Sequence, residues 1–137
     1  MTEIIAKLVF DSWTEPIPEL RAEGNGDRHL IYEGDGVILD LLIREVKGGT
    51  RLHVGGQVLP EEITNGNHVF DLPVLLEHGK SRSFTHTNAL GEFTFQMVPN
   101  GSFDLTIVLN NKRFCVRGLS NSQPMMWRVE PSLVAGD

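Results

Sequence analysis

The sequence is poor in cysteine: Cys115 is the only one among 137 residues. A single thiol cannot form a disulfide within the chain, and zinc clusters built on cysteine need at least a pair. Proteins that are kept reduced in the cytoplasm have no need of disulfides. We therefore expect a cytoplasmic location and no disulfide framework.

Basic residues and long apolar runs are also scarce. The chain has 12 Lys and Arg against 18 Asp and Glu, which gives a formal net charge of −6. A nucleic-acid surface needs a surplus of basic residues, so we expect no direct contact with nucleic acid. The apolar runs are far shorter than the roughly 18 residues that span a bilayer, so we expect no membrane span.

Residue patterns that carry catalysis or bind metal are missing as well. The five histidines show neither H-x-H nor H-x-x-x-H spacing. Cys115 stands between Phe114 and Val116, which is more typical of a packed thiol than of a nucleophile beside a base. Ser81 and Ser83 lack the G-x-S-x-G context of a hydrolase. We therefore expect no enzymatic activity, no metal site and no cofactor.

What the sequence does contain is a series of short apolar runs separated by turn residues. Most of them alternate apolar and polar residues with period two, as half-buried strands do, and no segment has a sustained helical period. The runs are 4–10, 29–33, 37–46, 51–58 and 69–76, with more after residue 90. Gly34-Asp35-Gly36 and Gly48-Gly49 are turn residues between runs, Gly55-Gly56 suggests a bulge or close packing, and Pro73 suggests a sheet edge or a bulge. This pattern predicts an all-β chain that folds as an antiparallel β-sandwich of about seven to nine strands.

The most specific segment extends from Thr87 to Ile107 and predicts a turn, a strand, a second turn and a second strand. Gly91 provides the backbone freedom that the first turn requires, and Pro99-Asn100-Gly101 forms the second. Asn110-Asn111 then closes a hairpin onto residues 113–118. The core residues predicted for this half are Phe93, Phe95, Phe103, Leu105, Ile107, Leu109, Phe114 and Val116.

This arrangement resembles the carboxypeptidase regulatory-like, or transthyretin-like (prealbumin-like), β-sandwich family. The family pattern is T-[DN]-x-x-G-x-F-x-F-x-x-V-P-x-G-x-F/Y-x-L-x-I, and residues 54–59 and 72–76 are similar to its upstream strands. The resemblance covers residues 51–118. It implies a transthyretin-like or immunoglobulin-like sandwich that serves as a non-catalytic regulatory or interaction module. The Asn-rich loop at 65–67 departs from the common form, so no family binding loop is carried over.

A second resemblance concerns the first part of the chain. Residues 7–13, Lys-Leu-Val-Phe-Asp-Ser-Trp, and Leu30-Ile31-Tyr32 are similar to segments of small bacterial proteins encoded beside alternative sigma factors. It implies a sigma-factor-linked signalling or defence system and a larger regulatory assembly. Residues 1–46 then extend the sandwich, so that 1–137 is one domain. Its parts are an N-terminal strand with a Pro- and Gly-containing loop (1–28), the sandwich (29–118) and a C-terminal tail (119–137).

Two regions are candidates for contact with a protein partner. Residues 1–70 hold 12 acidic and 6 basic groups, and Glu15, Glu19 and Glu23 lie in the loop of this acidic half. Such a run can serve partner binding, or it can simply solvate the loop. The second candidate is Trp127, in an apolar tail that forms either a last strand or a partner-binding segment.

The alternative function is an envelope or carbohydrate-binding accessory module. Sugar binding would need an exposed aromatic platform. The chain has 7 Phe, 2 Trp and 1 Tyr, and most of the Phe residues stand at predicted core positions. Trp13, Tyr32 and Trp127 remain as the aromatic candidates for such a platform.

Overall fold

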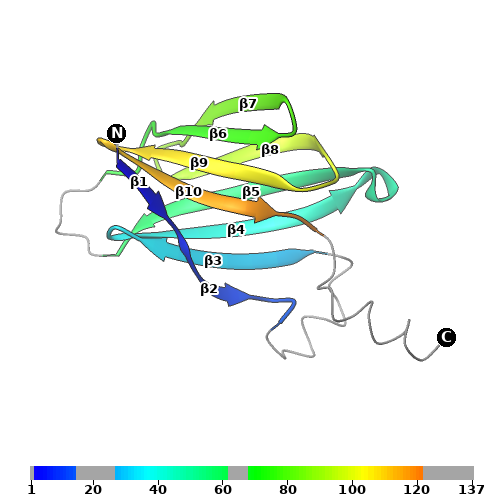
Figure 1. The fold of residues 1–137 in the computed structure, drawn as a ribbon, viewed down its shortest axis with the longest axis horizontal. Coiled ribbons are helices and arrows are strands. Elements are labelled where there is room, and N and C mark those ends of the chain that lie inside the picture. The colour runs from blue at the N-terminus through cyan, green and yellow to red at the C-terminus, as the bar shows by residue number, and fades with distance from the viewer. Residues whose placement is uncertain (1, 15–26, 62–67, 122–137) are drawn as a thin grey trace.

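Ten strands make up two five-stranded sheets in the computed structural model, which describes residues 2–14, 27–61 and 68–121. Sheet A has the order β1-β10-β9-β6-β7 and sheet B the order β2-β3-β4-β5-β8 (Figure 1). The strands are β1 (Thr2–Ile5), β2 (Lys7–Asp11), β3 (Arg28–Gly34), β4 (Val37–Val46), β5 (Arg51–Pro60), β6 (Pro73–His78), β7 (Ser81–His86), β8 (Glu92–Pro99), β9 (Phe103–Leu109) and β10 (Lys112–Leu119). A single 3-10 turn, η1 (Lys47–Gly49), joins β4 to β5.

The predicted all-β sandwich is confirmed, and every strand pair is antiparallel except β1 with β10. The described residues form ten strands, against the seven to nine that the sequence predicts. One extra strand arises because the run 4–10 is two strands, and another because residues 81–86 form β7. Strand β7 has only one large apolar side chain, Phe84, so its sequence does not show the alternation of apolar and polar residues by which a strand is recognised.

The N-terminal run changes sheets at Ala6. Strand β1 pairs in parallel with β10, and the Ala6 N–H donates to the Cys115 carbonyl at 2.9 Å. The chain then crosses to sheet B, where β2 pairs antiparallel with β3, and Figure 1 shows this passage between the two sheets. Because side chains alternate with the same period in both sheets, the sequence pattern could not show the crossing.

Tight turns join most neighbouring strands where the sequence predicts them. Asp35 (φ 51°) and Gly36 (φ 80°) connect β3 to β4 with positive φ at both central residues, as a type I′ hairpin requires. Asn110 (φ 47°) begins the two-residue turn between β9 and β10. The predicted hairpins are therefore confirmed.

The core lies between the two sheets and contains all eight residues predicted for the C-terminal half. Strands β3, β4 and β5 of sheet B contribute Leu30, Tyr32, Val37, Leu39, Leu41, Ile43, Leu52, Val54 and Val58. Gly56 faces the same core, and a Cβ there would lie 2.3 Å from the Phe93 ring. Of the two glycines at which the sequence predicts a bulge or close packing, Gly56 is the closely packed one.

Pro73 has a different place from the one expected. The sequence suggested a sheet edge or a bulge, but β6 is an interior strand between β9 and β7. Pro73 is its first residue, and a sheet tolerates proline at that position.

Candidate functional site

A row of side chains crosses the outer face of sheet A. The strand registers place Ile5 beside Cys115, Cys115 beside Thr106, Thr106 beside Leu75, and Leu75 beside Phe84. The residues on either side of Cys115, Thr106 and Leu75 are buried in the core, so these three side chains face away from it. The registers place Ile5 and Phe84 on the same outer face. We call this set the outer row.

The two ends of the outer row are its exposed parts. Phe84 is 69% exposed and Ile5 is 62% exposed, while Leu75 and Thr106 are half-buried. Cys115, a free cysteine, is buried although it lies on this outer face. A lone exposed apolar residue is ordinary, but here the row extends from one edge of the sheet to the other, with apolar side chains on either side of the half-buried Thr106.

Three arginines border the outer row, each beside a carboxylate. Arg117 Nη2 lies 3.0 Å from Glu3 Oε2, and Arg113 Nη2 lies 3.9 Å from the same oxygen. On the far side, Arg82 Nε lies 3.3 Å from Glu77 Oε2. The Glu3 carboxylate raises the pKa of Arg117 above its ordinary value, and a hydrogen bond with Cys115 adds to this. A mostly apolar row bordered by arginine is a composition common in protein interfaces.

The outer face of sheet B carries a different arrangement. His29 Nε2 lies 2.6 Å from Asp40 Oδ1, and the Phe10 ring packs edge-on against the imidazole at 5.5 Å between centroids. The Ser12 hydroxyl oxygen accepts a hydrogen bond from the backbone N–H of His29 at 2.9 Å. Serine, histidine and aspartate thus come together, but the hydroxyl contact shown is to the backbone and not to the ring that would act as a base.

A corner at the end of β2 is held by a buried ion pair. Arg28 donates from Nη2 to Asp11 Oδ2 at 2.6 Å and from Nε to Asp11 Oδ1 at 3.1 Å. Its Nη1 donates to the Ser120 carbonyl at 2.8 Å, and its guanidinium lies 4.9 Å from the centre of the Trp13 ring. These contacts connect β2 and β3 to the end of β10, which is a structural role.

The two aromatic candidates for sugar binding that the structure describes, Trp13 and Tyr32, do not form a platform. Trp13 donates from Nε1 to the Asp27 carbonyl at 2.9 Å and stacks with Arg28. Tyr32 is 9% exposed, belongs to the core, and has a pKa raised by burial. Trp127 lies outside the described residues.

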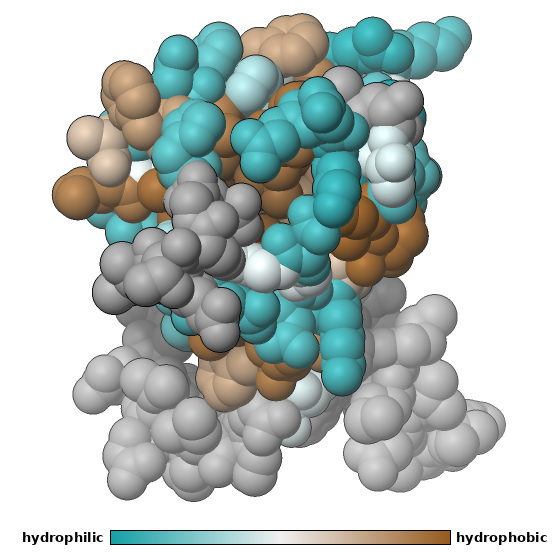
Figure 2. Space-filling model, turned by 90° about the vertical axis from the view of Figure 1, so that its left-hand side faces the viewer, coloured by the Kyte–Doolittle hydropathy of each residue, from teal (hydrophilic) through white to brown (hydrophobic). Residues whose placement is uncertain are grey.

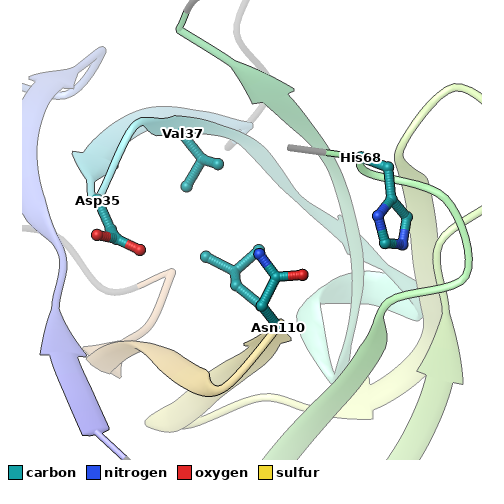
Figure 3. A pocket seen from close by; sticks show the side chains of 5 residues that line it. Asp35, Val37, His68 and Asn110 are labelled. Atoms are coloured by element: carbon teal, nitrogen blue, oxygen red, sulfur yellow. The ribbon is translucent and has the colours of Figure 1, made fainter. Parts of the chain in front are cut away.

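A small hollow lies at one end of the sandwich, between the β3–β4 and β9–β10 turns. It is lined by Asp35, Val37, His68, Leu109 and Asn110 (Figure 3). Its volume is about 10 Å³, room for roughly one water molecule. Figure 2 shows this end of the molecule, where hydrophilic side chains cover much of the middle and apolar ones gather toward the sides. The hollow is too small for an organic substrate.

Residues 2–14, 27–61 and 68–121 contain no group of three or more His, Cys, Asp or Glu side chains that could hold a metal ion. Within the same residues, no helix has the length and apolar composition needed to cross a bilayer.

The site residues predicted from the sequence are Glu15, Glu19, Glu23 and Trp127. All four lie outside the described residues, so their role as partner contacts stays a prediction. The outer row was missed by sequence reasoning, because it needs the register between strands that are distant in sequence. The one local sign of this row in the sequence is Phe84, a large apolar residue within the otherwise polar segment 81–86.

Comparison of the chain with family models, with curated proteins and with solved structures gives no match.

Proposed function

We propose that this chain is a non-enzymatic protein-interaction module, and that it binds its partner through the outer row of sheet A. The observation that carries the proposal is the mostly apolar row that crosses sheet A, with Phe84 and Ile5 exposed at its two ends. An aromatic anchor and bordering arginines are the residue types in which binding energy is usually concentrated.

The dimensions of the outer row favour a macromolecular ligand. The row crosses five strands, and with strands about 4.8 Å apart it extends roughly 19 Å. It lies on the open outer surface of a sheet and not in a cleft, whereas small-molecule sites are concave. A protein surface is the ligand that covers such a flat row best.

The regulatory context belongs to the same proposal. The 87–107 motif supports a transthyretin-like module, and the segments at 7–13 and 30–32 support a sigma-factor-linked signalling or defence system. A cytoplasmic module of a larger regulatory assembly would fit both resemblances and the single buried thiol.

Position 84 tests the proposal directly. A photo-cross-linking amino acid at position 84 is expected to form protein adducts in the source cell. The partner identified there should bind purified Phe84→Ala at least about tenfold more weakly than the unaltered chain, as the loss of an interface anchor does. Isothermal titration calorimetry would measure the affinity, and stability should change by no more than about 0.5 kcal/mol.

Leu90 offers a matched control for position 84. It is 63% exposed, close to the value for Phe84, but it lies in the turn between β7 and β8 and not in the outer row. Cross-linking from position 90 should give no specific adduct, and Leu90→Ala should bind the partner normally. Equal behaviour of the two positions would contradict the use of the outer row.

The acidic loop makes a separate prediction. Reversing the charge at Glu15, Glu19 and Glu23 with lysine should leave stability within about 0.5 kcal/mol per site. It should slow association with a basic region of the partner, most strongly at low salt, because exposed charges act mainly on the association rate. Stopped-flow binding at two salt concentrations measures this effect. A folded triple variant with unchanged association would remove the loop from the interface.

A further inference from the structure

The sandwich has four sheet edges, and three of them carry features that hinder the pairing of another strand. Strand β2 has a bulge at Val9, since the register with β3 shifts between Leu8 and Phe10. Strand β8 has a bulge where its register with β5 shifts, and Met97 there has φ 60°. Strand β1 is four residues long. Bulges and short strands are common protections of sheet edges.

Strand β7 has none of these protections. It pairs with β6 over six residues in unbroken register, from Pro73 opposite His86 to His78 opposite Ser81. In the described part of the chain no strand pairs with its other side, and Figure 1 shows β7 at the margin of sheet A. It contains neither proline nor glycine, and five of its six residues are exposed. A regular, open edge of this kind is a template for an added strand.

The backbone groups that face the open edge can be assigned from the pairing. The Thr87 N–H donates to the Leu72 carbonyl at 3.0 Å, and the Thr87 carbonyl accepts from the Asp71 N–H at 2.9 Å. Thr87 therefore directs both groups toward the strand that leads into β6. Since these directions alternate along an antiparallel strand, Ser81, Ser83 and Thr85 also face β6.

The same alternation turns the N–H and carbonyl groups of Arg82, Phe84 and His86 toward the open edge. The pairing of His86 with Pro73 agrees with this, because proline has no N–H to donate to it. Three residues thus offer six backbone groups to an incoming strand.

The side chains at this edge determine which residue types in an incoming strand would be complementary. Arg82 and Phe84 are two residues apart, so they lie on the same outer face of sheet A. Lys80 and Arg82 are the charged residues of 79–86, and both are basic. Arg82 already pairs with Glu77 on β6, but only through Nε at 3.3 Å and at an exposed site, so its Nη groups stay available to an acidic side chain on the open side. Because charges beyond about 8 Å are largely screened at physiological salt, the net charge of −6 matters less to an entering strand than these two nearby cations.

We propose that β7 accepts an extended segment of a partner protein as an added strand, with an acidic residue opposite Arg82 and an apolar residue opposite Phe84. This inference rests on the proposed function and specifies how the partner binds. Backbone hydrogen bonds to Arg82, Phe84 and His86 provide affinity, and the two side-chain pairs provide specificity. A second copy of this chain fits less well, since pairing β7 with itself brings two Lys80 and two Arg82 side chains to one short ladder.

The probe for this inference is a displayed library of random ten-residue peptides, selected on the intact 137-residue protein. Selected peptides should contain Asp or Glu two positions from a large apolar residue, with high strand propensity. Hydrogen exchange followed by NMR should show that the peptide newly protects the amides of Arg82, Phe84 and His86. The amides of Ser83 and Thr85 already face β6, so their protection should change little.

Two substitutions of Arg82 distinguish the contribution of its backbone N–H to binding from the contribution of its side-chain charge. Arg82→Ala removes the cross-strand charge pair, which should weaken the selected peptide by about two- to fivefold. Arg82→Pro also removes an edge N–H and should weaken binding by at least a further tenfold or so. An edge strand tolerates proline where its N–H faces solvent, so thermal melting should show both variants folded. His86→Pro against His86→Ala repeats the comparison at the end of the strand.

Each outcome decides the inference. Equal binding by Arg82→Pro and Arg82→Ala, or amide protection on another strand, would overturn strand addition. If Phe84→Ala abolishes partner binding while the proline variants at positions 82 and 86 still bind, the partner uses the outer row and strand addition at β7 is wrong. If neither Phe84→Ala nor the proline variants weaken partner binding, the proposed function is wrong as well. Dimers in analytical ultracentrifugation that protect the β7 amides without peptide would identify a second copy as the occupant and overturn the proposed one.

Discussion

Phe103→Ala is expected to lower the free energy of unfolding by about 3–5 kcal/mol, the usual cost of truncating a buried phenylalanine. Phe103 is 2% exposed and begins β9, where it faces the core opposite Leu119 of β10. Close-packed neighbours cannot collapse fully into the space that the ring leaves, so a cavity term adds to the lost hydrophobic burial. Urea denaturation followed by tryptophan fluorescence would measure the change.

Phe84→Ala is the matched control for this loss, because it makes the same chemical change on an exposed strand position. Its effect on stability should stay within about 0.5 kcal/mol. Since small domains are stable by only about 5–15 kcal/mol, the difference between the two variants should be plain in their denaturation midpoints. An unchanged midpoint for Phe103→Ala would show that the inward register of β9 is wrong.

The second large effect is expected for Gly91→Ala, with a loss of at least about 2 kcal/mol. Gly91 has φ 80°, where a residue with a Cβ is strained by roughly 1–2 kcal/mol. A Cβ there would also lie 2.3 Å from the Val58 carbonyl oxygen. The backbone cannot easily move aside, because Gly91 accepts a hydrogen bond from the Val58 N–H at 2.8 Å and donates one to the Asn88 carbonyl at 2.9 Å. Differential scanning calorimetry would measure the loss.

Gly55→Ala provides the contrast. Gly55 lies on the outer face of sheet B without a positive φ, and a Cβ there would have its nearest neighbour, His53 Nε2, at 3.8 Å. Alanine at such a permissive position should be neutral or should add about 0.4–1 kcal/mol by restricting the unfolded chain. If both glycine variants lost the same stability, the Gly91 effect would not come from its turn and its contact with Val58.

Much of the sandwich could be predicted because its signals are local. Asp35-Gly36 and Asn110-Asn111 are turn residues for steric reasons that operate within a few bonds. Phe93 and Phe95 alternate with polar residues, and so do Phe103, Leu105 and Ile107 at the start of β9, so their inward face could be predicted without knowledge of any other strand.

The candidate site could not be predicted in the same way. Its members come from β1, β10, β9, β6 and β7, and they became neighbours only through the register of four strand pairs. Ile5 and Phe84 are nearly 80 positions apart in the sequence. No local pattern specifies which outward-facing residues of separate strands will adjoin, because outward side chains are not selected by burial in the core.

The sequence by itself determined that the chain is all-β, where several of its turns lie and which side chains of the C-terminal half enter the core, because steric preference and hydrophobic alternation act over a few residues. The tertiary structure alone decided that residues 4–10 divide between two sheets at Ala6, that β7 forms an open edge, and that the outer row is continuous. These features depend on hydrogen bonds between segments distant in the chain, and such bonds form between backbone groups that every residue type except proline carries in full.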